Sequence, residues 1–421
     1  MKTDFTRTDR LPRVNASMSK RKYWLGFWAI IVSGFIIRMI SLCPYGFFCD
    51  VPPQLKAMRA NTFFLFFPGY MPLQLLFWGL AQCGLELFQA MWLISLACGV
   101  GSVFYVALAA RRAAGEGFSL LAAAVMAFGI LPVYFSVAGA SYPTDMLCVS
   151  GMIFHGWEYL RSRKAGSYYL ALAWLCFGIM MRPISAGFCC AGLAVLLWQG
   201  RDWRAALVSM LALALTVAAY TAISVHYYGS LAAIIHASQS HGFKSEVGDR
   251  GWRGTVSNLA RVGIYAVYGF QVWLVFTGWL AWRNWRLRKG LLLLFLLALA
   301  GPYFLFLIGY IPHAGYYCLL IPAVALLPAC FLPPLPSGGL RFFGWVGAAF
   351  VAVALCQWLL IRPVPTTSLA TGAANAYILQ YSRSGIRQGM FETLASIMFK
   401  NNLETNLISP QRANSLRDGG H

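Results

Sequence analysis

The chain has 421 residues, of which 59% are hydrophobic and only 11% are charged, whereas about 25% of the residues of an ordinary soluble domain are charged. This composition excludes an ordinary soluble globular protein and favours a membrane protein. The formal net charge of +20 does not indicate a nucleic-acid-binding protein, because the basic residues form short clusters between long apolar runs and not one basic face.

The apolar runs predict about eleven transmembrane helices in an all-α polytopic integral membrane protein. In chain order they are 23–42, 87–110, 119–137, 143–160, 167–181, 184–199, 204–225, 262–282, 290–309, 316–332 and 342–361. No small-residue cleavage site follows the basic segment 1–22, so we expect the first span to be retained as an anchor.

The positions of lysine and arginine predict the orientation, because these residues are enriched in cytoplasmic loops. With a cytoplasmic N-terminus every inner loop is basic, and the short outer turns 138–142 and 310–315 contain neither residue type. The inner-loop residues are Lys20, Arg21, Lys22, Arg111, Arg112, Arg161, Arg163, Lys164, Arg201, Arg204, Arg283, Arg286, Arg288, Lys289 and Arg341. The C-terminus is then periplasmic.

Two segments are not simple spans. A single helix over 167–199 would be about 50 Å long, which is too long for the hydrocarbon core, and Arg182-Pro183 in its middle predicts a break between two helices of a tight hairpin. Segment 68–82 is apolar but short and begins with two prolines, so it predicts an interfacial or re-entrant helix on the outer face.

These elements divide the chain into a basic cytoplasmic N-terminus (1–22), a transmembrane domain (23–361) and a short periplasmic tail (362–421). The outer loops 43–86 and 226–261 are long enough to contribute to a site. Cys43 and Cys49 flank a short outer loop and could form a disulfide.

Asp50 and Asp145 are the carboxylates best placed for chemistry. Asp50 follows the first span, and Asp145 begins the fourth in Tyr142-Pro143-Thr144-Asp145. A carboxylate at the membrane edge is costly to desolvate unless it is used or paired, and two on one face can activate and orient an acceptor hydroxyl. The alternatives are that Asp50 is an ordinary loop residue and that Asp145 only initiates a helix.

The same face carries cations suited to a phosphate group, since arginine offers a planar, bidentate donor fork. The phosphate-binding candidates are Lys56, Arg59, Arg182, Arg250, Arg253 and His313, with Arg38, Tyr142 and His241 as supporting residues. Any single cation could instead snorkel to lipid head groups, and Arg38 either does so or faces the bundle interior beside Asp50. The histidines lack a helical metal-ligand spacing, so we expect no metal and no other cofactor.

The order of these motifs resembles the GT-C membrane glycosyltransferases, in particular the branch with protein O-mannosyltransferases and the lipid A aminoarabinose transferase. Arg38 near the end of span one precedes Asp50 in the first outer loop. The following motifs are Pro-Gly-Tyr-Met-Pro-Leu (68–73), Arg-Arg-x-x-Gly (111–115), Leu-Pro-Val-Tyr-Phe-Ser (131–136), Asp145 and Met181-Arg182-Pro183. The resemblance covers 23–200 well and 201–330 loosely.

The resemblance implies a polyprenyl-phosphate-linked sugar as donor and an acceptor glycolipid, glycan or protein on the outer face. Asp50 would be the general base and Asp145 the second acid. Two features depart from the family pattern, the first of them from the form seen in the aminoarabinose branch. The Glu-Lys-Pro-Pro form is replaced by Phe66-Phe67-Pro68-Gly69, and 362–421 is too short for the large soluble C-terminal domain of some members.

We therefore expect a multi-pass enzyme of the bacterial inner membrane with its active face in the periplasm. The alternatives are a transporter or flippase of lipid-linked glycans, which would need polar residues near the bilayer midplane and often inverted repeats, a polymerase or ligase that uses a diphosphate-linked donor, and a non-catalytic assembly factor. The basic loop 244–261 keeps the polymerase interpretation open.

Overall fold

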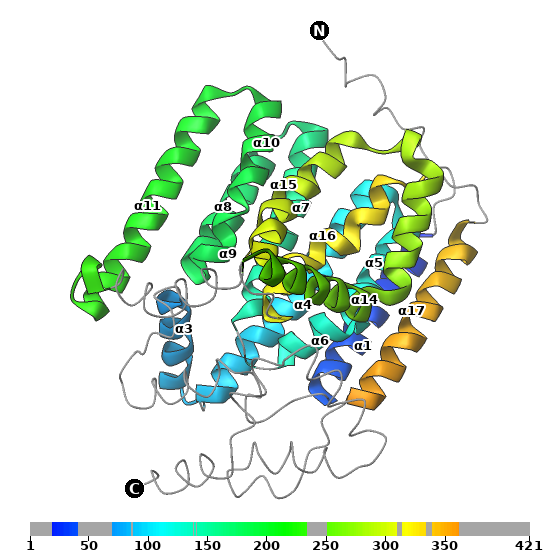
Figure 1. The fold of residues 1–421 in the computed structure, drawn as a ribbon, viewed down its shortest axis with the longest axis horizontal. Helices are drawn as coiled ribbons and strands as arrows, with labels where there is room; N and C mark the ends of the chain where they lie inside the picture. Colours follow the sequence, from blue (N-terminus) through cyan, green and yellow to red (C-terminus); the bar gives the residue numbers. More distant parts are fainter. Residues whose placement is uncertain are drawn as a thin grey trace, which may run out of the picture.

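The computed structural model describes residues 19–40, 70–233 except 86, 138 and 140, 251–309, 314–333 and 339–361. Every regular element in these ranges is a helix, and they contain no strand (Figure 1). The predicted all-α class is therefore confirmed for the described part of the chain.

The helices follow the predicted apolar runs. They are α1 (Lys20–Ile40), α3 (Met71–Gln82), α4 (Leu87–Ala114), α5 (Glu116–Phe128), α6 (Ile130–Val137), α7 (Tyr142–Ser162), α8 (Ala165–Met181), α9 (Pro183–Gly187), α10 (Cys190–Gly200), α11 (Trp203–Tyr228), α14 (Gly251–Asn284), α15 (Gly290–Gly309), α16 (Ile321–Leu326) and α17 (Gly339–Ile361), with short 3-10 helices η2 (Trp285–Leu287), η3 (Ala314–Leu319) and η4 (Leu327–Cys330). The short outer segment predicted as an interfacial or re-entrant helix contains α3.

Four helices in the described ranges are long and apolar enough to cross a membrane, namely α1, α4, α11 and α15, and the bent pair α5–α6 is a fifth candidate. In α11 only 6% of the most apolar window is buried, and Leu207, Leu211 and Leu215 are exposed. Such a surface fits contact with lipid. The total of about eleven spans stays a prediction, because the other runs are shorter, kinked or broken.

Prolines account for several of these breaks. Pro132 has no N–H to donate to the carbonyl of Phe128, where α5 ends, and α6 continues at an angle of 50°. Pro183 begins α9 after α8 has ended, which confirms the predicted break at 182–183. The predicted span 262–282 is part of a longer helix, α14, with non-helical backbone at Gln271.

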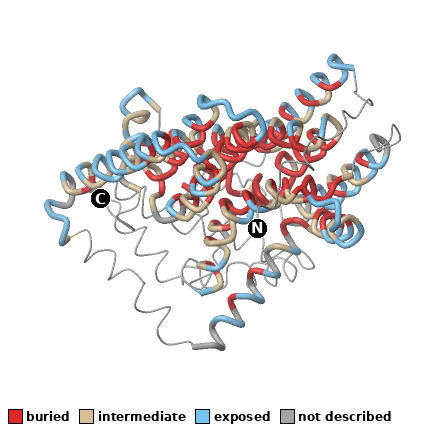
Figure 2. The backbone as a smooth tube through the Cα atoms, turned by 90° about the horizontal axis from the view of Figure 1, so that it is seen from above, coloured by how far each residue is buried: buried red, intermediate tan, exposed pale blue. Residues whose placement is uncertain are grey.

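The core of the molecule lies where α7 packs against α4 and α8, and where α5 packs against α1, α4 and α17. Figure 2 shows the buried residues concentrated in the central helices, with exposed residues along the outer ones. At the α7–α8 contact, a Cβ on Gly151 would lie 2.5 Å from the indole of Trp174. Glycine therefore permits the close approach of these two helices.

Arg38 joins α1 to the bend between α5 and α6. Its side chain is fully buried, and its Nη1 donates to the carbonyls of Ala127 (2.8 Å) and Gly34 (3.1 Å), while Nη2 donates to Met126 (3.0 Å). The last carbonyls of a helix lack partners within it, and a cation near that end is favourable. Arg38 thus caps α5 from the bundle interior and does not snorkel. Its expected neighbour Asp50 lies outside the described residues.

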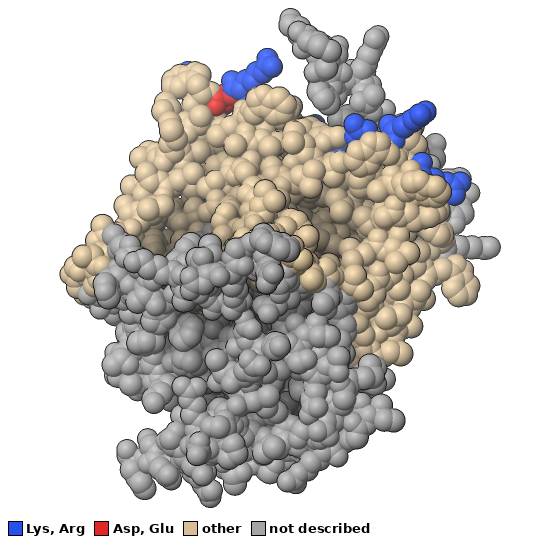
Figure 3. Space-filling view, viewed as in Figure 1, with Lys and Arg blue, Asp and Glu red and all other residues tan. Residues whose placement is uncertain are grey.

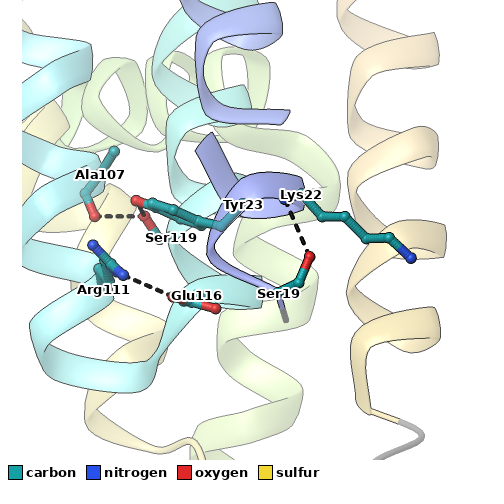
Figure 4. A network of polar contacts seen from close by, with 7 residues as sticks. All are labelled: Ser19, Lys22, Tyr23, Ala107, Arg111, Glu116 and Ser119. Atoms are coloured by element: carbon teal, nitrogen blue, oxygen red, sulfur yellow. Dashed lines mark hydrogen bonds and ion pairs between the residues drawn. The ribbon is translucent and has the colours of Figure 1, made fainter. Parts of the chain in front are cut away.

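A second set of polar contacts joins α1, α4 and α5 at their other ends (Figure 4). The Tyr23 and Ser119 hydroxyls are 3.0 Å apart, and Ser119 donates to the carbonyl of Ala107 at 2.7 Å. Arg111 forms an ion pair with Glu116 (2.7 Å) and lies 4.4 Å from the centroid of the Tyr23 ring. The first helix is therefore fixed at both ends.

The exposed cations gather at this same end of the described bundle, as Figure 3 shows along its upper edge. Among them are Arg161, Arg163 and Lys164 at the C-terminal end of α7, and Arg201 and Arg204 around the start of α11. This distribution supports the pattern from which a cytoplasmic N-terminus was predicted. The orientation in a bilayer stays a prediction.

Replacing Arg38 with Met should lower the free energy of unfolding by roughly 2 kcal/mol or more, because it leaves buried carbonyls of α5 without their donors. Thermal unfolding in detergent, followed by tryptophan fluorescence, measures this effect. Arg286→Met is the matched control, since Arg286 is exposed in η2 and should change stability by less than about 0.5 kcal/mol. Equal midpoints for the two variants would contradict the capping role.

Candidate functional site

Asp145 and Arg182, two of the predicted site residues, form a buried ion pair. Asp145 lies in the first turn of α7, where Pro143 begins the helix, and Arg182 lies at the break between α8 and α9. Nη1 of Arg182 donates to Oδ2 of Asp145, and each residue is only 2% exposed. Asp145 therefore lies at the start of a helix, as the alternative of a helix-initiating residue predicts. It also has a specific charge partner in Arg182.

Tyrosine side chains surround the guanidinium of Arg182. Its Nη2 donates to the hydroxyl of Tyr70 at 3.0 Å. Its Cζ lies 4.3 Å from the ring centroid of Tyr142, 5.1 Å from that of Tyr70 and 6.0 Å from that of Tyr316. Rings at these distances stabilise a cation through their quadrupoles. Four segments therefore contact one another around the guanidinium of Arg182. They are the start of α3, the start of α7, the α8–α9 break and η3.

The electrostatics of the pair limit what Arg182 can do. Its positive charge is offset by the Asp145 carboxylate, and two of its nitrogens already donate to Asp145 and Tyr70. Separating a buried pair of this kind leaves an uncompensated charge, which costs about 3–5 kcal/mol. The arrangement fits a role for Arg182 in holding Asp145 better than direct binding of a phosphate.

The pair lies at the end of α7 opposite to the exposed cations. α7 begins with Tyr142 and ends beside Arg161 and Arg163, and a helix of this length spans about 30 Å. In the predicted orientation the pair is therefore near the periplasmic end of the bundle.

The structure does not bring all predicted site residues together. Asp50, Lys56, Arg59, His241, Arg250 and His313 lie outside the described residues, and Arg253 lies in α14 with its side chain outside the description. Arg38 binds carbonyls of α1 and α5 and forms no hydrogen bond with Asp145 or Tyr142. Within the described ranges no three His, Cys, Asp or Glu side chains are grouped to hold a metal.

Sequence reasoning missed Tyr70 and Tyr316 as partners of Arg182. Tyr70 belongs to the motif Pro-Gly-Tyr-Met-Pro-Leu, which indicated a short helix and the family resemblance but no role for the tyrosine. Tyr316 is separated from Arg182 by 134 positions in the sequence, and no spacing rule connects them. The order of the motifs could have pointed to Tyr70 as a site residue. No pattern in the sequence pointed to Tyr316.

A family model supports the resemblance stated from the sequence. The model described as dolichyl-phosphate-mannose-protein mannosyltransferase matches residues 74–228, a little more than a third of the chain, and this segment contains both Asp145 and Arg182. No curated protein and no solved structure matches the chain significantly. Over residues 74–228 the chain is therefore similar to the protein mannosyltransferases, a family of GT-C glycosyltransferases, and this similarity supports the resemblance.

Proposed function

We propose that the enzyme transfers one sugar from a polyprenyl-phosphate donor to a hydroxyl of a glycolipid, glycan or protein on the periplasmic face of the bacterial inner membrane. The observation that carries this proposal is the position of the buried Asp145–Arg182 pair. It lies within the family-matched segment 74–228 and at the end of α7 away from the exposed cations.

The proposed reaction is a direct displacement at the anomeric carbon. Asp50 takes the proton of the acceptor hydroxyl while the acceptor oxygen forms the new glycosidic bond. The bond between the anomeric carbon and the phosphate oxygen breaks, and polyprenyl phosphate leaves with the electron pair. One inversion at the anomeric carbon follows from this single step.

Cationic groups stabilise the charge that develops on the departing phosphate. We assign this task to Lys56, Arg59, Arg250, Arg253 and His313 on the outer loops, with His241 as a supporting donor. A monophosphate held by such groups requires no metal.

The roles of the described residues follow from their contacts. Asp145 is the second acid and orients the acceptor or the base, and Arg182 positions Asp145 through their ion pair. Tyr142 and Tyr70 hold Arg182 through their rings and a hydroxyl. The apolar helix α3 and the outer ends of the spans would hold the lipid chain of the donor.

Asp50→Asn should abolish transfer while leaving the protein in the membrane, because the amide cannot accept the acceptor proton. Mass spectrometry of surface glycolipids and glycoproteins tests this in cells with the gene deleted, restored, or restored as the variant at matched expression. A single-sugar mass increment should disappear on deletion, return with the wild type and stay absent with Asp50→Asn. Full restoration by the variant would rule out Asp50 as the base.

Asp145→Asn should lower the free energy of unfolding by about 3–5 kcal/mol, because the charge of Arg182 then remains buried without a carboxylate. The double variant Asp145→Leu with Arg182→Met should recover most of this stability and still show no transfer. Thermal unfolding and transfer assays on the purified protein measure the two properties separately.

Glu158→Gln is the matched control for the loss of a carboxylate, since Glu158 pairs with the largely exposed Arg112 at 3.4 Å. The expected change in unfolding free energy is at most about 1 kcal/mol. Wild-type transfer by the apolar double variant would show that the buried pair serves only folding.

A further inference from the structure

Gln74 is a polar residue in the middle of the buried face of α3. Leu73 and Phe77 on this helix are also buried, and Gln74 itself is 1% exposed. The backbone N–H of Gln74 donates to the carbonyl of Tyr70 at 2.9 Å, so these two residues lie one turn apart on the same side of the helix. Tyr70 is the residue whose hydroxyl binds Arg182.

The carboxamide of Gln74 has no hydrogen-bond partner among the described residues, at either Oε1 or Nε2. Burial of an amide without partners costs about 1–3 kcal/mol in proteins, and most buried polar atoms in folded proteins are paired. An apolar residue of similar size would fill this position at lower cost. Folding alone therefore does not explain a glutamine here.

The elements around Gln74 add further polar groups. α3 packs against α4, α8 and α11. The largely exposed helix α11 carries Ser224, which is fully buried, and Tyr220, which is half-buried. Through α3 these polar groups lie beside the Arg182 site, while Leu76 and Trp78 of the same helix are exposed apolar side chains.

We propose that Gln74 binds the sugar of the lipid-linked donor, with its amide donating to one hydroxyl and accepting from a neighbouring one. A carboxamide offers both donors and an acceptor, which matches adjacent sugar hydroxyls. A phosphate offers acceptors only, and a polyprenyl chain offers neither. The exposed apolar side chains of α3 and α11 favour the donor over a soluble acceptor, because the donor would arrive through the membrane. This inference rests on the proposed function and names a sugar contact within it.

The test compares two probes on the purified full chain in nanodiscs. One is sugar-free polyprenyl phosphate, and the other is a panel of polyprenyl-phosphate sugars carrying mannose, glucose, galactose or aminoarabinose. Wild-type protein should bind one member of the panel more tightly than the sugar-free lipid. Gln74→Met should reduce that difference roughly 10-fold, the loss expected for about two hydrogen bonds, with binding of the sugar-free lipid unchanged.

Stability distinguishes a ligand contact from a structural one. Gln74→Met should keep or raise the thermal unfolding midpoint, because it removes an unpaired buried amide. Gln82→Met is the matched control at the exposed C-terminal end of the same helix, and it should change neither binding nor stability. Gln74→Asn, which retracts the amide by one methylene, provides a second variant and should also weaken sugar-dependent binding.

Two results would overturn the inference. An undiminished preference for the sugar-bearing lipid in Gln74→Met and Gln74→Asn would exclude the contact, and so would a clear loss of stability in Gln74→Met. A wild-type protein that binds the sugar-free lipid and no panel member more tightly would also contradict it. Failure of the wild type to bind any polyprenyl phosphate would instead count against the proposed function, which makes the two failures distinguishable.

Discussion

The ion pair between Asp145 and Arg182 is the contact on which the geometry of the proposed site depends. Both residues are buried, and neither charge is stable there without the other. The pair therefore fixes the start of α7 against the break between α8 and α9, and the tyrosines on the guanidinium attach the start of α3 and η3 to the same point. All of these segments therefore contribute to the position of Arg182, the charge partner of Asp145.

Much of this fold could be predicted from hydrophobicity and proline positions, because each acts locally. The break at Arg182-Pro183, the short helix within 68–82 and the helical class all follow from residues a few positions apart. The break at Gly129–Pro132 was not predicted, since the run 119–137 has the length of a single span. Pro132 lies within this run, and the structure shows that α5 ends at Phe128, four residues before it.

The site was harder to predict because its contacts join distant segments. Asp145 and Arg182 were each identified from their surroundings, yet their pairing depends on how α7 packs against α8. Arg182 was consequently expected to bind phosphate, whereas its charge is already offset. Gln74 gave no signal at all, since a single neutral amide in an apolar run changes neither hydrophobicity nor charge pattern.

The cap that Arg38 places on α5 has a consequence for the order of membrane insertion. Its acceptors Met126 and Ala127 follow it by 88 and 89 positions, and at about 5–20 residues per second they are synthesised several seconds later. During that interval α1 contains an arginine without its final partners, which costs about 2.5–3.5 kcal/mol at the centre of a span on insertion scales and less near its end. The first helix can therefore reach its lowest free energy only after the third predicted span has been synthesised and has packed against it.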